Sequence, residues 1–479
     1  MSDQLKEKTS SALFWSFIDK GGQQVIQLVF MIILARLLDP KEFGLVAVLT
    51  VFTVIATLLQ DSGFSAALIR KADIDEEDYS SVFYFNILIG IVAYFILFVC
   101  APFIADFYDA PILTGLSRFI FLSFLFSAFS IIQNVKLIRE MDFRTNAKIT
   151  FIAGIISGAL AVWMAFSGYG AWSLAAQLVL QSFIRSLFLW FFVKWYPKAR
   201  FAASRLKPMM AYSINLLIMS LLNQLAGSIY PIVIGKYFSM SQVGYYGQAY
   251  KLSYIPQSIV ATSLQGVAYP VLSKVEDTER KKRIFRKIIR VSSFVSFPVM
   301  ILLAIAAEPI ISIVLSDKWL ESVPILQILA VGAIVFPLYS VINSLVLSFG
   351  KSQLSLKVEV FRNILSICFI LASVKYGILA MVAGLSLSRI IAFIVSFYTI
   401  KNDIAYRFME MLKDIMPYFV ISVCTFIPLY FLKMYIGNYY VLLSIQITAG
   451  FGLYMLIVKT LGSKVLQECI EFFKKKKIS

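Results

Sequence analysis

The residues of this chain that could do chemistry lie inside its apolar segments. The first segment carries four polar residues at the spacing i, i+3, i+4 and i+7: Lys20, Gln23, Gln24 and Gln27. A helix places residues with this spacing on one face. Polar groups are costly in hydrocarbon, so the stripe predicts contact with other protein or with a water-filled cavity. A related polar stretch follows two hundred residues later: Ser220, Asn223, Gln224 and Gly227.

Charged residues also occur within these segments. Five are cations: Lys20, Arg185, Lys251, Arg362 and Arg389. Three are acids: Asp19, Asp61 and Glu359. Ionisable groups inside a membrane usually line a functional pathway. The cations outnumber the acids, which predicts a cavity that binds an anion. A single cation could instead extend to the membrane surface or lock two helices together.

The same acids are the candidates for coupling transport to an ion, because membrane carboxylates serve proton relays. Glu359 and Arg362 are three residues apart and could form an ion pair on one helix face. The sequence has no GxxxxGK[ST] loop, and without histidine it has no His-based zinc site or triad. The chain is therefore predicted not to be an enzyme, with no metal and no cofactor.

The elements that position these residues are predicted to be membrane helices. Of 479 residues, 59% are hydrophobic and only 15% are charged, against about a quarter in soluble domains. The pattern predicts an all-α polytopic membrane protein of about fourteen spans. They are expected near residues 12–38, 43–68, 80–105, 113–136, 147–167, 171–194, 209–237, 241–269, 287–307, 323–349, 355–375, 378–400, 413–433 and 438–460.

An internal duplication organises these spans. Arg36, Phe43 and Gly44 are matched by Lys236, Val243 and Gly244, and the Tyr-Gly pair at 169–170 recurs at 376–377. We expect two parallel repeats, each a six-helix lobe, related by a pseudo-two-fold axis along the membrane normal. The predicted domains are residues 1–207 (spans 1–6), 208–407 (spans 7–12) and 408–479, which hold two additional spans and a basic cytoplasmic tail.

The net charge of +17 follows the membrane topology. With the N-terminus in the cytoplasm, 32 of the 44 lysines and arginines fall on the cytoplasmic side. This predicts a multi-pass protein of the cell inner (plasma) membrane with both termini cytoplasmic and membrane lipids, not nucleic acid, as partners. The acidic segment 73–79 is expected to be a solvated cytoplasmic loop, and the cysteines are expected to be buried.

Several short motifs, in order along the chain, carry a family resemblance. They are FWSFIDKGGQQVIQLVFMIILARLLDPKEFGLVAV, DSGFSAALIRK, LIREMDFR, GYGAWSL, VGYYGQAYKL and YPVLSK. Over most of residues 10–400 the chain resembles the polysaccharide transporter family, the Wzx-like flippases of the multidrug/oligosaccharidyl-lipid/polysaccharide exporter superfamily. The resemblance implies two six-helix lobes plus two helices. It also implies movement of undecaprenyl-diphosphate-linked oligosaccharides to the outer leaflet for surface polysaccharide (lipopolysaccharide or exopolysaccharide) biosynthesis.

The leading hypothesis is thus a lipid-linked oligosaccharide flippase that works by alternating access through a cationic cavity, with glycan polymerase or ligase machinery as a further partner. The predicted cavity residues are Lys20, Gln23, Gln24, Gln27, Asn223, Gln224, Arg185, Lys251, Arg362 and Arg389. The alternatives are an ion-coupled multidrug-type exporter, a lipid II flippase and a non-transporting scaffold. The sequence does not identify the sugar repeat, the coupling ion, the oligomeric state or which cations bind the diphosphate.

Overall fold

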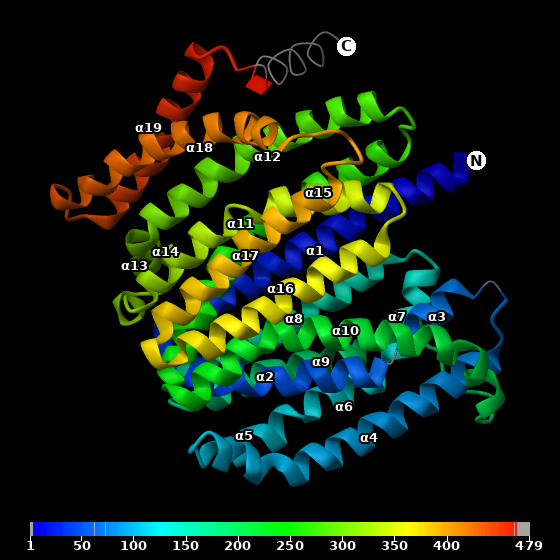
Figure 1. Cartoon of the computed structure of the whole chain (residues 1–479). Coiled ribbons are helices and arrows are strands. Elements are labelled where there is room, and N and C mark those ends of the chain that lie inside the picture. The colour runs from blue at the N-terminus through cyan, green and yellow to red at the C-terminus, as the bar shows by residue number, and fades with distance from the viewer. Residues whose placement is uncertain (1–2, 62, 72, 464, 467–479) are drawn as a thin grey trace. The chain divides into compact units, whose positions relative to one another are not determined.

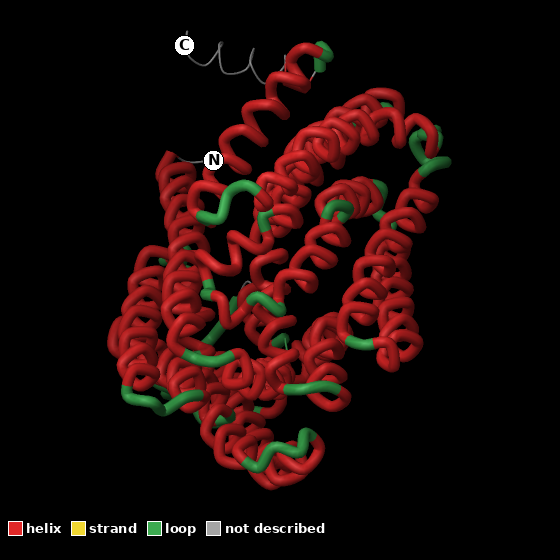
Figure 2. Tube along the Cα trace, turned by 90° about the vertical axis from the view of Figure 1, so that its left-hand side faces the viewer, coloured by secondary structure: helices red, strands yellow, loops and turns green. Residues whose placement is uncertain are grey.

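The structure is a computed structural model that describes residues 3–61, 63–71, 73–463 and 465–466 (Figure 1). The side chains of Asp61, Asn223 and some other helical residues lie outside this description. Throughout the described residues the chain consists of helices and connecting loops, without strands (Figure 2). This confirms the predicted all-α class.

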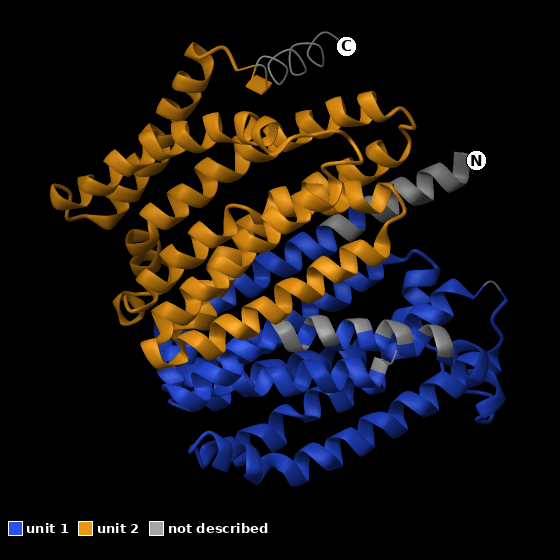
Figure 3. Ribbon diagram, viewed as in Figure 1, with its two compact units in different colours: residues 1–244 blue, residues 245–479 orange. Residues whose placement is uncertain are grey.

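Two compact units make up the chain, residues 1–244 and residues 245–479 (Figure 3). The boundary lies one helix beyond the predicted repeat boundary at residue 207, because the helix Ala203–Tyr237 packs against helices of the first unit. Compact units are defined by packing and repeats by sequence, so the division into repeats stays a prediction.

The first unit contains ten complete helices among the described residues. They are α1 (Asp3–Leu37), α2 (Pro40–Asp61), α3 (Phe64–Arg70), α4 (Glu76–Phe107), α5 (Ile112–Ile120), α6 (Leu122–Ala128), α7 (Ile131–Arg139), α8 (Phe143–Phe166), α9 (Ala171–Val193) and α10 (Ala203–Tyr237). Within this unit α8 packs between α1 and α9, and α10 packs against α2, α3 and α4.

The second unit begins inside α11 (Met240–Ser273). Its other helices are α12 (Thr278–Ile305), α13 (Ala307–Val314), η1 (Asp317–Trp319), α14 (Ser322–Ala333), α15 (Phe336–Ser348), α16 (Ser352–Ser373), η2 (Val374–Tyr376), α17 (Ile378–Ile400), α18 (Phe408–Tyr430), η3 (Phe431–Met434) and α19 (Tyr439–Thr460). Here α17 packs against α14, α15 and α16, while α12 packs against α14, α15, α18 and α19.

The helix breaks repeat in the way that the sequence predicts. The break between α1 and α2 falls at residues 38–39, and the break between α10 and α11 falls at 238–239. The two Tyr-Gly pairs also have matching roles, since Gly170 precedes α9 with φ 54° and Gly377 precedes α17 with φ 94°. Glycine adopts such left-handed conformations at little cost, which explains why both helices start after a glycine.

Matching glycines of the two repeats meet each other. A methyl group on Gly44 would lie 1.7 Å from the carbonyl oxygen of Met240, and one on Gly244 would lie 2.0 Å from that of Pro40. Position 40 corresponds to 240 and position 44 to 244, so each half of the contact repeats the other. We call this contact between the starts of α2 and α11 the glycine crossing. Contacts of this reciprocal kind occur at two-fold axes.

Ten of the described helices, or continuous helix pairs, are long and apolar enough to cross a membrane, and eleven are if the bent run Ile112–Arg139 counts as one span. The helices α10, α11 and α16 are not among them, although they have 35, 34 and 22 residues. Each of the fourteen predicted spans coincides with one helix or with a broken run of helices. The three helices outside the apolar set carry much of the predicted cavity, including Gln224, Lys251 and Arg362.

The expectation that segment 73–79 is a solvated loop is wrong for its second half, which begins α4. Asp75 and Asp78 form a capping box, and the carboxylate of Asp78 is buried and pairs with Lys71 at 2.5 Å. Glu77 pairs with Arg205 at 2.7 Å. The acidic residues therefore cap a helix and hold the chain segments around it.

The cysteines also differ from expectation. Cys368 and Cys424 are exposed and Cys100 is partly exposed, on helices α16, α18 and α4. In a membrane helix an exposed face is compatible with a small apolar thiol, because lipid can cover it. Cys469 lies outside the described residues.

Candidate functional site

Three adjacent helices of the first unit present polar residues with a spacing of four. The helix α1 contributes Asp19, Gln23 and Gln27, and α8 contributes Asn146 and Thr150. The third helix, α9, adds a polar residue on each of three successive turns: Gln177, Gln181 and Arg185. A spacing of i, i+4 and i+8 keeps residues on one side of a helix. Because α8 packs against both α1 and α9, these residues form a polar track within the unit.

Close packing of α1 against α8 brings this track together. A methyl group on Gly158 would lie 2.4 Å from the ring of Phe30, and one on Gly22 would lie 2.4 Å from the ring of Phe151. Each glycine thus accepts a ring from the other helix. Small residues let membrane helices approach closely, which favours van der Waals contact.

Charged groups occupy one end of the polar track, and Asn146 bridges them. Its side-chain amide donates to Asp19 Oδ2 at 2.8 Å, and its Oδ1 accepts from Arg185 Nη2 at 3.2 Å. Arg185 Nη2 also donates to Asn134 Oδ1 at 2.8 Å. Asp19 Oδ1 is buried without a hydrogen-bond partner among the described atoms. Arg185 is therefore held inside the unit, and Asp19 keeps one acceptor atom open.

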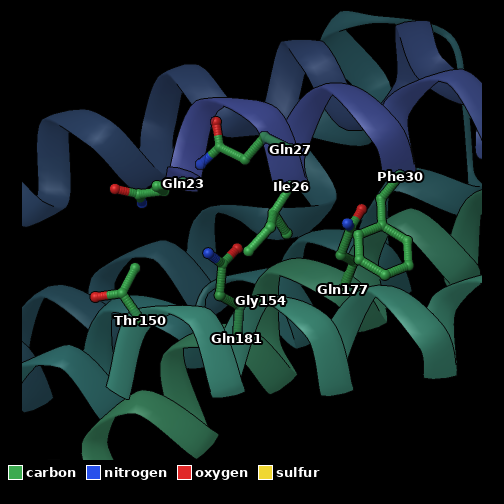
Figure 4. A pocket seen from close by; sticks show the side chains of 8 residues that line it. All are labelled: Gln23, Ile26, Gln27, Phe30, Thr150, Gly154, Gln177 and Gln181. Carbon is green, nitrogen blue, oxygen red and sulfur yellow. The ribbon is translucent and has the colours of Figure 1, made fainter. Parts of the chain in front are cut away.

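A small cavity lies further along the track (Figure 4). Its volume is about 10 Å³, which is the space that one water molecule needs. Polar side chains from all three helices line it, with Ile26, Phe30 and Gly154 completing the wall: Gln23, Gln27, Thr150, Gln177 and Gln181. Their amide and hydroxyl groups can hold a water, but the cavity is too small for a sugar.

The predicted stripe on α1 divides into two residues that line the small cavity and two that do not. By exposure, Gln23 is half-buried, and Lys20, Gln24 and Gln27 are exposed. Only Gln23 and Gln27 line the small cavity. Lys20 and Gln24 therefore point away from the interior of the first unit, as residues that meet a ligand or water would.

In the second unit the pairing predicted for Glu359 and Arg362 is confirmed. Arg362 Nη2 donates to Glu359 Oε1, and the hydroxyl of Tyr339 donates to Glu359 Oε2 at 2.9 Å. The Arg362 guanidinium lies 5.9 Å from the Tyr339 ring centre. Glu359 neutralises Arg362, so this arginine contributes less free positive charge than its sequence position suggested.

Arg389 has a different environment. Its guanidinium lies 6.0 Å from the ring centre of Tyr250, and its Nη1 is buried without a hydrogen-bond partner among the described atoms. Tyr250 stacks between Tyr246 and Tyr254, with ring centres 5.9 and 6.0 Å apart. An arginine with one unused donor, supported by an aromatic ring, is suited to accept an oxyanion.

Lys251 lies next to Tyr250 on α11 and is exposed. No described carboxylate forms an ion pair with Lys251 or with Arg389. On α10, Gln224 donates to the hydroxyl of Ser228 at 2.9 Å. The side chains of Asn223 and Asp61, which were predicted to line the cavity and to carry an ion, lie outside the described part of the chain.

Four uncharged members of the polar track were missed in the sequence: Asn146, Thr150, Gln177 and Gln181. Asn134 on α7, which accepts from Arg185, was missed as well. These residues carry no charge and belong to neither of the two polar stretches predicted, on the first apolar segment and at residues 220–227. A signal was present, because Gln177, Gln181 and Arg185 recur every four residues within an apolar helix.

The fold is that of a multi-pass, all-helical membrane protein with two compact units. It matches the structure titled lipid II flippase MurJ, inward closed conformation, with a TM-score of 0.76 and 16% identity over 94% of this chain and 99% of that chain. The sequence profile described as "Polysaccharide biosynthesis protein" matches residues 33–324, and the chain belongs to this family.

Two curated relatives extend across most of the chain. The teichuronic acid biosynthesis protein TuaB of Bacillus subtilis (strain 168) is 27% identical over 85% of this chain and 86% of its own length. The lipopolysaccharide biosynthesis protein WzxC of Escherichia coli (strain K12) is 25% identical over 89% of this chain and 88% of its own length. Family and fold confirm the predicted resemblance and the prediction that the chain is a transporter rather than an enzyme.

Proposed function

We propose that the chain is a flippase for surface polysaccharide biosynthesis, which moves a polyprenyl-diphosphate-linked oligosaccharide from the cytoplasmic to the outer leaflet of the inner membrane. Both termini would lie in the cytoplasm, as the distribution of lysine and arginine favours. The names of the curated relatives, which refer to teichuronic acid and lipopolysaccharide biosynthesis, support this substrate class.

The observation that carries the proposal is the unneutralised charge in the second unit. Lys251 is exposed on α11, and Arg389 on α17 retains an unpaired guanidinium N–H. A cation within a membrane helix is stable when a partner or water meets it, and a diphosphate oxygen is a strong acceptor for arginine. A cationic drug would be repelled by the same pair, which argues against the multidrug alternative.

We expect the conformational cycle of transport to follow from the predicted duplication. In transporters built from parallel repeats, the two repeats rock against each other around a substrate site near the middle of the membrane. The reciprocal glycine crossing supports such a relation between the repeats. Asp19 is the candidate ion carrier, because one of its oxygens is buried without a partner.

The test is a strain that lacks the chromosomal gene and carries Arg389→Gln, Arg389→Lys or wild-type protein on a plasmid. Arg389→Gln should lower surface polysaccharide about tenfold, since a hydrogen bond between charged groups contributes about 1.5–3 kcal/mol. Arg389→Lys keeps the charge and should retain more activity. Lys375→Gln changes an exposed lysine outside the predicted cavity and is the matched control.

Membrane levels of each variant are measured alongside the glycan, together with the lipid-linked precursor. A defective flippase leaves the precursor on the cytoplasmic side, where it accumulates. Wild-type glycan in the Arg389→Gln strain would refute the proposed role of Arg389. The gene is also deleted in a strain that cannot make the lipid-linked precursor, so that no precursor can accumulate. Death of this strain would point to lipid II as the cargo.

A further inference from the structure

A larger pocket of the first unit lies at the opposite end of α1 from the N-terminus. It has a volume of about 590 Å³. Residues of four chain segments line it: the start of α2, the connection from α4 to α5, the end of α10 and the start of α11. This end of the unit is the one predicted to face away from the cytoplasm. The pocket is large enough for a phosphate or a sugar acid.

Two lysines give the pocket a positive charge. Lys41 is exposed at the start of α2, and Lys236 lies near the end of α10. Lys236 Nζ donates to the carbonyl oxygen of Phe107 at 2.7 Å, which fixes its position. The acidic lining residue, Asp109, lies 3.6 Å from Lys236 and has a side chain 86% exposed, so its charge is largely screened by water.

Helix starts add to this charge. The lining includes Lys41, which follows the first residue of α2, Met240, the first of α11, and Ile112, the first of α5. A helix start carries unpaired N–H groups and about half a positive charge. Glu42 accepts from the N–H of Asp39, just before α2, at 2.8 Å, and Ser239 accepts from the N–H of Gln242 in α11 at 3.2 Å. Pro111 before α5 offers no side-chain cap, but the N–H groups of Leu113 and Thr114 donate to the carbonyl oxygens of Ala110 and Pro111 at 3.0 and 3.1 Å. The helix starts therefore add partial positive charge to the pocket rather than free N–H groups.

The hydroxyl of Tyr108 is the second indication of a ligand. Tyr108 is 6% exposed, lines the pocket, and its hydroxyl has no hydrogen-bond partner among the described atoms. Its ring packs on Gly235, where a methyl group would lie 2.9 Å from Cε1. Burial raises the pKa of Tyr108 to about 12, so it stays protonated and can donate. Buried hydroxyls without a partner are rare, and a bound acceptor would satisfy this one.

We propose that this pocket binds an anionic oxygen group, a phosphate or a carboxylate, with Lys41 and Lys236 supplying charge and Tyr108 donating a hydrogen bond. Two sources share this chemistry: the headgroup of an anionic membrane lipid and an acidic group on the transported cargo. The pocket shares no residue with the proposed site at Arg389. The cargo source rests on the proposed transport function, but binding can be tested without transport.

The experiment measures how fast each lysine of the full chain is acylated, by mass spectrometry, in nanodiscs of phosphatidylcholine. One arm adds sodium pyrophosphate, and a second arm replaces part of the lipid with phosphatidylglycerol. Labelling of Lys41 and Lys236 should slow by about threefold when two thirds of the pockets are occupied. Lys375, exposed and predicted to lie on the same side, is the internal control and should not change.

Tyr108→Phe removes one hydroxyl and keeps the ring that packs on Gly235, so it should fold. It should raise the probe concentration needed for half-protection about tenfold, because a hydrogen bond to a charged group is lost. Lys41→Gln should likewise weaken the protection of Lys236.

The two arms separate the sources. Protection by phosphatidylglycerol alone identifies a lipid headgroup, whereas protection by free pyrophosphate identifies a site open to a soluble or cargo phosphate. The proposal would be overturned if the acylation rates of Lys41 and Lys236 changed no more than that of Lys375 in both arms. Unchanged protection in Tyr108→Phe would remove Tyr108 from the site.

Discussion

Asn146 is an uncharged residue that holds two opposite charges in place. Its amide group donates to Asp19 and accepts from Arg185, so neither charge needs to contact the other directly. The charges themselves were evident in the sequence, because aspartate and arginine are rare in apolar segments. Asn146 was not, since its role depends on which helices lie side by side, and single amides are common. The sequence therefore predicted the ends of this network but not its centre.

At the level of single residues, we predict that Asn146→Ala destabilises the protein by about 2 kcal/mol, because it leaves Asp19 and Arg185 short of partners within the membrane. Thermal unfolding of purified protein in detergent measures the loss. The matched control is Gln24→Ala, which removes an exposed amide from α1 and should change stability by less than about 0.5 kcal/mol. Equal effects of the two changes would show that Asn146 is not a bridge.

The helices themselves were predictable because long apolar segments and the residues that break them form local sequence patterns. Each predicted span matches a helix or a broken run of helices. Packing partners were not predictable in the same way. Gly22 and Gly158 give no sign in the sequence that Phe151 and Phe30 fill the space beside them. The glycines instead set how closely α1 approaches α8, and so the width of the polar track.

For these elements, we predict that Gly158→Val separates α1 from α8, since the new side chain would occupy the position of the Phe30 ring. The expected cost is about 1–3 kcal/mol from overpacking, read as a lower unfolding temperature. Gly21→Ala is the control on the same helix pair, because a methyl group there meets nothing within 4 Å. It should stabilise α1 by about 0.5–1 kcal/mol. A stable Gly158→Val protein would mean that α1 can move without loss.

On the scale of the molecule, the sequence predicts a duplication, and the structure adds that residues at matching positions touch. The similarity of positions 36–44 to 236–244 gives an offset of two hundred residues but no distance in space. The compact units also follow packing rather than the repeats, because α10 lies with α2, α3 and α4. Sequence similarity between the repeats cannot predict which helices pack together. The repeat sequences would be the same whether α10 packed with the first unit or with the second.

The glycine crossing makes a prediction at this scale. Gly44→Ala and Gly244→Ala should destabilise the protein to a similar extent, because each methyl group meets a backbone carbonyl of the other helix. The double variant should cost less than both single changes together, since one separation of the helices relieves both clashes. Gly247→Ala, one turn further along α11 and free of contacts within 4 Å, is the control. Additive costs would contradict a shared contact.

The reciprocity of the glycine crossing bears on how such a chain could arise. The contact is self-complementary, so one surface is enough to form it. Two unlinked half-length proteins could therefore already associate through it as a symmetric dimer. Joining their genes would make the association permanent and leave each half free to diverge. The unequal distribution of charged residues, with the Asn146 network in one half and Arg389 in the other, is what such divergence would leave behind.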